Sequence, residues 1–265
     1  MSSDLFPKTD SVIGIIGGVG PYAGVELMRR ILDKTRVSKD QDHLPVALLS
    51  YPNIIEDRTD FILKKTRINP AYTLAKMIVQ LERLGSKIAG IACNTSYAPP
   101  IYNVIISELN RLDCKIKLLN IVTETIEYLE NTYSNINRIG LLTTHGVFKT
   151  KVYSEPLLNM GYEVVVPDED FQFDVIHNMI YHSEYGIKAS SNPINDNVTA
   201  LLSQAMNFFV DREVEAIILG CTEFALIKTL LYKYNMIWID TIDIFADSLI
   251  REYKSVVIPE LYTIR

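Results

Sequence analysis

Residues 88–95 read IAGIACNT and residues 216–222 read AIILGCT, so an apolar run followed by a cysteine and a threonine or asparagine occurs twice. Residues 13–20, IGIIGGVG, are echoed in the same way by residues 139–146, IGLLTTHG. The two cysteines are 128 residues apart, and the glycines that end the other pair are 126 apart. An apolar strand before a glycine turn recurs by chance in many proteins, but the matched cysteines favour a duplicated unit.

Eight short runs rich in aliphatic and β-branched residues predict strands, several of them apolar throughout, as expected of strands covered on both faces. They span Val12–Ile16, Val46–Ser50, Lys87–Ala92, Ile116–Ile121, Arg138–Thr143, Glu163–Val166, Ala216–Leu219 and Met236–Ile239. Periodic stretches between them predict helices, two of which follow Pro21 and Pro70. This alternation predicts an α/β fold with mostly parallel sheets and helices on both faces.

The duplication predicts two pseudo-symmetric lobes, each a mostly parallel sheet flanked by helices, with the functional site in the cleft between them. No linker rich in proline, glycine or serine divides the chain, so we expect the lobes to pack closely. We place one lobe at residues 1–117 plus 236–265, carrying Cys93, and the other at residues 118–235, carrying Cys221. Both cysteines would then approach the cleft from opposite sides.

Composition and charge exclude several classes of protein. The 265 residues are 48% hydrophobic, enough for a full core, and the net charge of −6 gives no electrostatic footprint for nucleic acid or an anionic membrane. The first ten residues lack an apolar core, and no run approaches the roughly 18 apolar residues of a membrane span, so we expect a cytoplasmic protein. The three cysteines form no CxxC pair, which argues against disulfides and zinc. A small molecule remains the best candidate partner.

Cys93 and Cys221 each end a predicted strand and precede a predicted helix. The carboxyl ends of such strands line the ligand crevice, and the positive end of the next helix stabilises a thiolate. Two thiols on opposite faces of one ligand suit a two-base racemase or epimerase, because one removes a proton and the other returns one. Hydrolysis by one nucleophilic cysteine would leave the second unexplained. Cys114 is expected to be a buried, inert thiol.

Polar residues follow both thiols. Asn94, Thr95 and Thr222 could hold a substrate carboxylate, and they could equally cap the following helices. Glu223 is expected to be a first-turn helix acid rather than a catalytic group. Residues 17–23, GGVGPYA, contain a GxGxxA pattern, but no acidic residue ends the next strand, so we interpret Gly18 and its neighbours as a turn that a ligand approaches rather than an NAD site.

Two loop cations and three histidines carry weaker signals. Arg58 and Lys188, taken alone, would be ordinary solvated charges. His145, His177 and His182 lack the spacing of metal ligands, so no metal site is expected.

Seven short motifs occur in order between residues 12 and 243: IGIIGGVGP, DQDHLP, IIEDRT, IACNT, LLTTHG, YGIK and ILGCTE. Through them the chain resembles the cofactor-independent aspartate/glutamate racemases, especially the aspartate racemase branch. The resemblance implies two pseudo-symmetric α/β lobes with the site between them, a homodimer, and no cofactor, neither pyridoxal phosphate nor metal.

The resemblance also assigns roles to individual residues. It implies that Cys93 and Cys221 are the two acid/base thiols. It implies that polar residues next to these thiols bind the α-carboxylate: Asn94, Thr95 and Thr222. Binding of the acidic side chain falls to two cations with two threonines nearby: Arg58, Lys188, Thr143 and Thr144. One position departs from the family, because many relatives have a histidine where this chain has Tyr97.

The sequence therefore favours a racemase that interconverts L- and D-aspartate, with glutamate as a further candidate substrate. Its expected partner is a small acidic amino acid, with no nucleic acid and no membrane. Two alternatives stay open: a related two-cysteine isomerase or racemase with another substrate, and a catalytically silent two-lobed protein that binds an amino acid.

Overall fold

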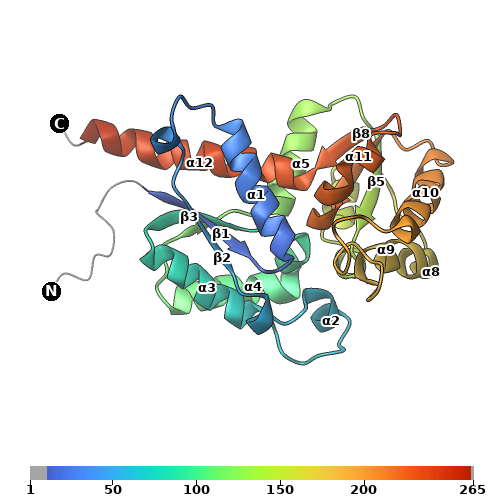
Figure 1. Cartoon of the computed structure of the whole chain (residues 1–265), viewed down its shortest axis with the longest axis horizontal. Coiled ribbons are helices and arrows are strands. Elements are labelled where there is room, and N and C mark those ends of the chain that lie inside the picture. The colour runs from blue at the N-terminus through green and yellow to red at the C-terminus, as the bar shows by residue number, and fades with distance from the viewer. Residues whose placement is uncertain (1–10, 264–265) are drawn as a thin grey trace.

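The computed structural model describes the backbone of residues 11–263 and the side chains of residues 11–256. Two lobes lie next to each other along the long axis of the molecule (Figure 1), and each is built on one four-stranded sheet. The predicted α/β fold is confirmed. The ends of the predicted first lobe, residues 1–10 and 264–265, lie outside the described part of the chain.

The first sheet has the order β2-β1-β3-β4, and every pair in it is parallel. Its strands are β1 (Val12–Gly17), β2 (Val46–Ser50), β3 (Ser86–Ile91) and β4 (Lys117–Leu118). The longer helices around it are α1 (Pro21–Lys34), α3 (Ala71–Arg83), α4 (Pro99–Arg111), α5 (Ile121–Thr132) and α12 (Thr241–Thr263). Helices α1 and α12 pack together on one side of the sheet, and α3 and α4 on the other (Figure 1). The central strands are apolar throughout because both their faces are covered.

The second sheet repeats this order as β6-β5-β7-β8, again with parallel pairs only. Its strands are β5 (Arg138–Thr143), β6 (Glu163–Val165), β7 (Ala216–Gly220) and β8 (Ile237–Asp240). The helices of this lobe are α6 (His145–Thr150), α7 (Ser154–Asn159), α8 (Glu169–Phe171), α9 (Asn178–Tyr181), α10 (Asp196–Val210) and α11 (Lys228–Leu231), with a π-helical segment η4 (Gln172–His177). The identical strand order supports the duplication inferred from the sequence.

All eight predicted strands are present, and one is much shorter than predicted. The run at residues 116–121 forms only β4, because Asn120 starts the next helix. Its side chain accepts hydrogen bonds from the backbone N–H groups of Val122 and Thr123, at 3.0 and 3.4 Å, and thereby caps α5.

The predicted lobe boundary is wrong at one strand. We expected residues 236–240 in the first lobe, but β8 pairs with β7, from Ile237 beside Ala216 to Asp240 beside Leu219. An apolar run does not reveal which sheet edge it joins. The chain returns to the first lobe directly afterwards, because Asp240 accepts hydrogen bonds from the N–H groups of Ile242 and Asp243 and so begins α12.

The two lobes share buried apolar packing. One cluster of buried side chains contains Ile13 and Ile16 from β1 together with Ile139 and Leu141 from β5. The lobes therefore meet as one packed body around the site. Across residues 11–263, no helix is both long and apolar enough to cross a membrane.

Gly90 in β3 lets α12 lie directly on the first sheet. A Cβ atom at Gly90 would stand 2.5 Å from two ring atoms of Phe245, which is fully buried. We expect Gly90→Ala to lower the free energy of unfolding by about 1–3 kcal/mol, because the ring cannot move without disturbing its neighbours. Urea denaturation measures this loss. In the double variant with Phe245→Leu part of it should be recovered, and a Gly90→Ala protein as stable as the wild type would contradict this packing.

Candidate active site

Both cysteines lie at the carboxyl ends of central strands. Cys93 follows β3 and begins the 3₁₀ turn η3 (Asn94–Tyr97), and Cys221 follows β7 and begins the 3₁₀ turn η5 (Thr222–Ile227). In each sheet this strand stands next to the point where the strand order reverses, which is where ligands bind in open α/β sheets. The two thiols line one small cavity of about 10 Å³, room for roughly one water molecule.

The inner cavity, as we call this space, also brings together most of the residues that the sequence analysis proposed for binding. They are Arg58, Asn94, Thr95, Thr144, Lys188 and Thr222. Thr143 is the exception: it does not line the cavity, its methyl group lies under Gly220, and its carbonyl accepts a hydrogen bond from Gln172 Nε2 at 3.0 Å. The structure therefore gives no support to a binding role for the Thr143 side chain.

Hydrogen bonds between the lobes close the inner cavity. The hydroxyls of Thr95 and Thr144 lie 3.0 Å apart, and Thr222 Oγ1 donates to the carbonyl of Ala92 at 3.3 Å. Tyr153 donates its hydroxyl to Asn94 Oδ1 at 2.6 Å. These contacts join polar groups of the two lobes directly across the cavity.

Arg58 is buried beside Cys93. It is the first residue of α2 (Arg58–Ile62), which Asp57 caps by accepting from the N–H groups of Thr59 and Asp60. The guanidinium donates to the carbonyl of Val19 at 2.5 Å and to that of Glu56 at 3.3 Å. Burial opposes its charge, but Cys93 and Asp57 hold the pKa of Arg58 above its usual range.

One N–H donor of the Arg58 guanidinium has no acceptor among the described residues. This donor is Nε, which is buried. A buried donor without a partner is costly, so one hydrogen bond of this guanidinium is left unmade within the described part of the chain.

Cys221 lies against a carboxylate instead of a cation. Its thiol donates to Glu223 Oε2 at 3.0 Å, and Thr222 Oγ1, whose one hydrogen is shared between this oxygen and the carbonyl of Ala92, lies 3.2 Å from the same oxygen. Burial raises the pKa of the Cys221 thiol well above its usual range, and the charge of Glu223 raises it further. Cys221 is therefore a neutral thiol in this arrangement.

Glu223 is paired with Lys188 through its other carboxylate oxygen. Burial alone would raise the pKa of Glu223, but Lys188 lowers it below its usual range. Burial would lower the pKa of Lys188, but the charge of Glu223 raises it above its usual range. Glu223 does stand in the first turn of η5, as predicted, but the contact of its buried carboxylate with Cys221 was not foreseen.

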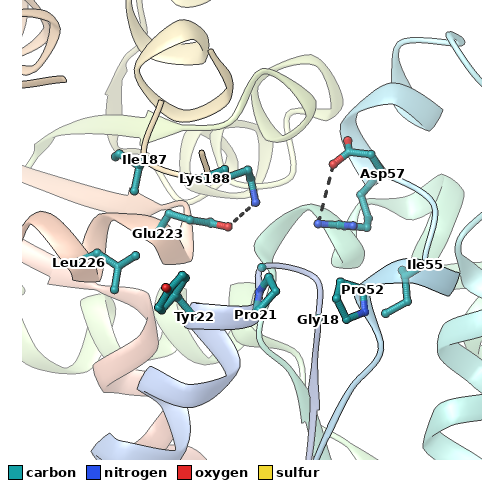
Figure 2. A pocket seen from close by; sticks show the side chains of 12 residues that line it. Gly18, Pro21, Tyr22, Pro52, Ile55, Asp57, Ile187, Lys188, Glu223 and Leu226 are labelled. Atoms are coloured by element: carbon teal, nitrogen blue, oxygen red, sulfur yellow. Dashed lines mark hydrogen bonds and ion pairs between the residues drawn. The ribbon is translucent and has the colours of Figure 1, made fainter. Parts of the chain in front are cut away.

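An outer chamber of about 230 Å³ lies next to the inner cavity, and Figure 2 shows the side chains that line this chamber. The two spaces share Arg58, Lys188 and Glu223, and apolar side chains such as Ile55 and Leu226 line the rest of the chamber. Lys188 and Asp57 lie on opposite sides of it in Figure 2. The chamber is large enough for an amino acid, and we interpret it as the entrance to the thiols.

The glycine-rich turn after β1 borders this chamber. Gly18 lines it and has a φ of +74°, and a Cβ there would lie 2.8 Å from the backbone N of Tyr51. A Cβ at Gly20 would lie 2.2 Å from Glu223 Oε1. The turn therefore lets a carboxylate of the other lobe approach the start of α1, where a dinucleotide-binding protein would hold phosphate.

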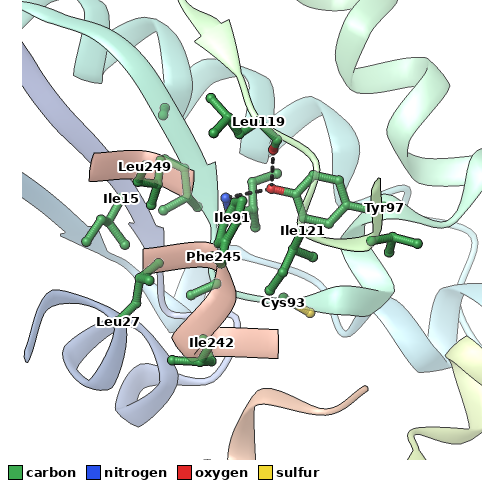
Figure 3. Packing of buried hydrophobic residues seen from close by; sticks show 14 of the residues in the cluster. Ile15, Leu27, Ile91, Cys93, Tyr97, Leu119, Ile121, Ile242, Phe245 and Leu249 are labelled. Atoms are coloured by element: carbon green, nitrogen blue, oxygen red, sulfur yellow. Dashed lines mark hydrogen bonds between the residues drawn. The ribbon is translucent and has the colours of Figure 1, made fainter. Parts of the chain in front are cut away.

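Tyr97, at the position where many relatives have a histidine, is a core residue. Its hydroxyl accepts from the N–H of Ile91 at 2.9 Å and donates to the carbonyl of Leu119 at 2.8 Å (Figure 3). The ring packs edge-on against Phe245. Tyr97 therefore fixes the end of β3 just before Cys93 without lining either cavity.

Two histidines of the second lobe, His145 and His177, belong to one aromatic cluster, whereas His182 stacks separately on Tyr185. His177 stacks on Phe173 and Tyr181 and meets His145 edge-on. Burial lowers the pKa of His177 to about 4, and His145 adds to the effect, so the imidazole is neutral near pH 7. Over the described residues, no three side chains of histidine, cysteine, aspartate or glutamate are grouped to hold a metal ion.

Fold and site together define a two-lobed α/β protein that presents one thiol from each lobe to a shared cavity. The chain belongs to the Asp/Glu/hydantoin racemase family, whose model matches residues 16–249. The predicted family is thus confirmed, and with it an amino-acid racemase as the class of enzyme.

Solved structures agree with this placement. Aspartate racemase from Picrophilus torridus is 26% identical, with a TM-score of 0.74 over 92% of this chain and 94% of that one. Glutamate racemase from Francisella tularensis, solved with D-glutamate, is 20% identical, covers 91% of this chain and 80% of that one with a TM-score of 0.61, and shows the fold alone. An uncharacterized protein from Pectobacterium carotovorum is 27% identical over 43% of this chain and 69% of its own length.

Proposed function

We propose that the protein interconverts L- and D-aspartate, with glutamate as the second candidate substrate, by proton transfer between two cysteines and without a cofactor. The observation that carries this proposal is the pair of thiols, Cys93 and Cys221, at equivalent strand ends and on one cavity. The similarity to aspartate racemase supports aspartate as the first substrate to test.

In this mechanism the substrate passes through the outer chamber and places its α-carbon between the thiols. Asn94, Thr95 and Thr222 receive the α-carboxylate, where their donors also stabilise the charge that develops when the α-hydrogen leaves. Arg58 and Lys188 receive the side-chain carboxylate, the former with its unpartnered Nε. The chain binds an anion in spite of its net negative charge because these cations lie at the cavity.

The proton transfers follow from the partners of the two sulfurs. In the direction in which Cys93 is the base, its sulfur, beside the Arg58 guanidinium, takes the α-proton, so that a C–H bond breaks and an S–H bond forms. Cys221, held as a thiol, gives its proton to the opposite face of the α-carbon and becomes a thiolate. In the reverse direction the two cysteines exchange roles, as two-base catalysis requires.

The test is α-hydrogen exchange. Purified protein without added cofactor is incubated with L-aspartate or D-aspartate in D₂O, and NMR and chiral chromatography follow the reaction. We expect the α-position to become deuterated and both starting materials to reach equal amounts of the enantiomers. Absence of exchange with aspartate and glutamate would refute the proposal. Saturable binding by calorimetry without exchange would instead support the silent binding protein.

A further inference from the structure

The two thiols of the site have electrostatic partners of opposite sign. Cys93 has the buried guanidinium of Arg58 as its partner. Cys221 donates to the carboxylate of Glu223 at 3.0 Å. A cation favours the ionised form of a thiol and an anion favours its protonated form, so a site that must work in both directions is built asymmetrically.

Glu223 is fixed in place by contacts on every side. Its Oε2 accepts from Cys221 and shares the hydroxyl hydrogen of Thr222 with the carbonyl of Ala92, and its Oε1 is paired with Lys188. The first lobe closes over it, since a Cβ at Gly20 would lie 2.2 Å from the same Oε1. A carboxylate held in this way keeps its geometry relative to the Cys221 sulfur.

Few other charges act on this pair. Among the described residues, the charged side chains that line the two cavities are Asp57 and Arg58 from the start of α2, Lys188 from the loop after α9, and Glu223 itself. Tyr181 on α9 has the Lys188 ammonium 5.2 Å from its ring centroid, and burial raises the pKa of Tyr181, so it remains neutral. Tyr22 on α1 lines the outer chamber.

We propose that Glu223 is a positioning residue that makes the two thiols unequal: its carboxylate holds the proton on Cys221, whereas the charged neighbour of Cys93 is the guanidinium of Arg58. The inference rests on the proposed racemase function. The enantiomer whose α-hydrogen faces Cys93 has the thiol that must act as the acid, Cys221, already protonated on its opposite face. The other enantiomer needs the arrangement with the proton on Cys93.

The equilibrium between the enantiomers determines which kinetic constants can reveal the asymmetry between the two thiols. The equilibrium constant between enantiomers is one, so kcat/KM is the same for both in every variant. The asymmetry must therefore appear as a difference in kcat matched by an equal difference in KM. Removing the charge of Glu223 should move the ratio of the two kcat values toward one.

The decisive experiment measures the alkylation rate of each cysteine in Glu223→Gln. The protein reacts with iodoacetamide between about pH 6 and 10, the range in which thiols ionise, and peptide mass spectrometry identifies the modified cysteine. Without the carboxylate, the pKa of Cys221 falls, and we expect it to be alkylated about tenfold faster at pH 8, since one pKa unit is a tenfold change in thiolate. Cys93 and Cys114 in the same chain are internal controls. Glu223→Asp, which keeps the charge, should restore slow alkylation of Cys221.

The kinetic arm uses the same variants. The ratio of kcat for L- and D-aspartate should move toward one by about three- to tenfold in Glu223→Gln, with equal kcat/KM values throughout. If Cys221 reacts at the wild-type rate in the folded variant, the inference is overturned. Should Glu223→Gln not fold, Lys188→Gln serves instead, because it removes the cation that opposes the charge of Glu223. We expect Cys221 to be alkylated more slowly in Lys188→Gln, and an unchanged alkylation rate would likewise overturn the inference.

These outcomes separate the inference from the proposed function. A wild-type protein that does not exchange the α-hydrogen of acidic amino acids ends the racemase proposal. If the wild-type protein racemises aspartate but Cys221 is alkylated at the same rate with and without the Glu223 carboxylate, only the positioning role is refuted.

Discussion

Cys93→Ser and Cys221→Ser should each lower the rate of aspartate racemisation at least about 100-fold in both directions. A serine hydroxyl has nearly the size of the thiol but is far less acidic, so it cannot serve as the base, and its alkoxide is a poor alternative to a thiolate. Each direction needs one sulfur to take a proton and the other to give one. Both substitutions should therefore inactivate both directions. Chiral chromatography of initial rates measures the loss.

Isotope exchange makes this prediction sharper. In Cys221→Ser, Cys93 can still remove an α-proton and return deuterium from D₂O to the same face. We therefore expect one enantiomer to exchange its α-hydrogen without inversion in this variant, and the opposite enantiomer to do so in Cys93→Ser. The result would also assign each cysteine to an enantiomer.

The third cysteine provides the matched control. Cys114 is partly buried and lines neither cavity. Cys114→Ser should racemise aspartate within about twofold of the wild-type rate, since substitutions away from a site have small effects. Full activity in Cys93→Ser or Cys221→Ser would contradict the two-thiol mechanism, whereas full activity in Cys114→Ser is required by it.

Local sequence patterns predicted much of the fold because strands covered on both faces are encoded as apolar runs. The repeat that relates Cys93 to Cys221 predicted their common position at strand ends, and the structure places both on one cavity. It did not predict the sheet that residues 236–240 join, since the same apolar run would suit the free edge of either sheet. The strand order of the first sheet, with β4 at its edge, shows that β8 is the equivalent edge of the second.

The site was harder to predict where side-chain direction mattered. Thr143 and Thr144 are adjacent, so near a strand end they point to opposite sides, and only Thr144 lines the inner cavity. The contact of Glu223 with Cys221 depends on the turn η5, which no motif encodes. A usable signal was Gly20, because its missing side chain makes room for Glu223 from the other lobe.

Arg58→Lys should lower kcat/KM for aspartate about 10- to 100-fold although it keeps the positive charge. The guanidinium directs two donors at backbone carbonyls, and a third, Nε, is buried without a hydrogen-bond partner among the described residues. A lysine ammonium cannot reproduce this fixed fork. Losing one charge-assisted hydrogen bond to a buried anion costs about 1.5–3 kcal/mol, and about 1.36 kcal/mol corresponds to a tenfold change in rate. Steady-state kinetics measures the change, and thermal unfolding verifies the fold.

Two comparisons test whether the Arg58 guanidinium binds the substrate. Arg111→Lys alters an exposed arginine on α4 that pairs with Glu108 one turn away, and it should leave kcat/KM within about twofold of wild type. Succinate carries two carboxylates without the amino group, so it should inhibit the wild type competitively and bind Arg58→Lys more weakly by a similar factor. If Arg58→Lys keeps wild-type kcat/KM and wild-type affinity for succinate, Arg58 does not bind the substrate.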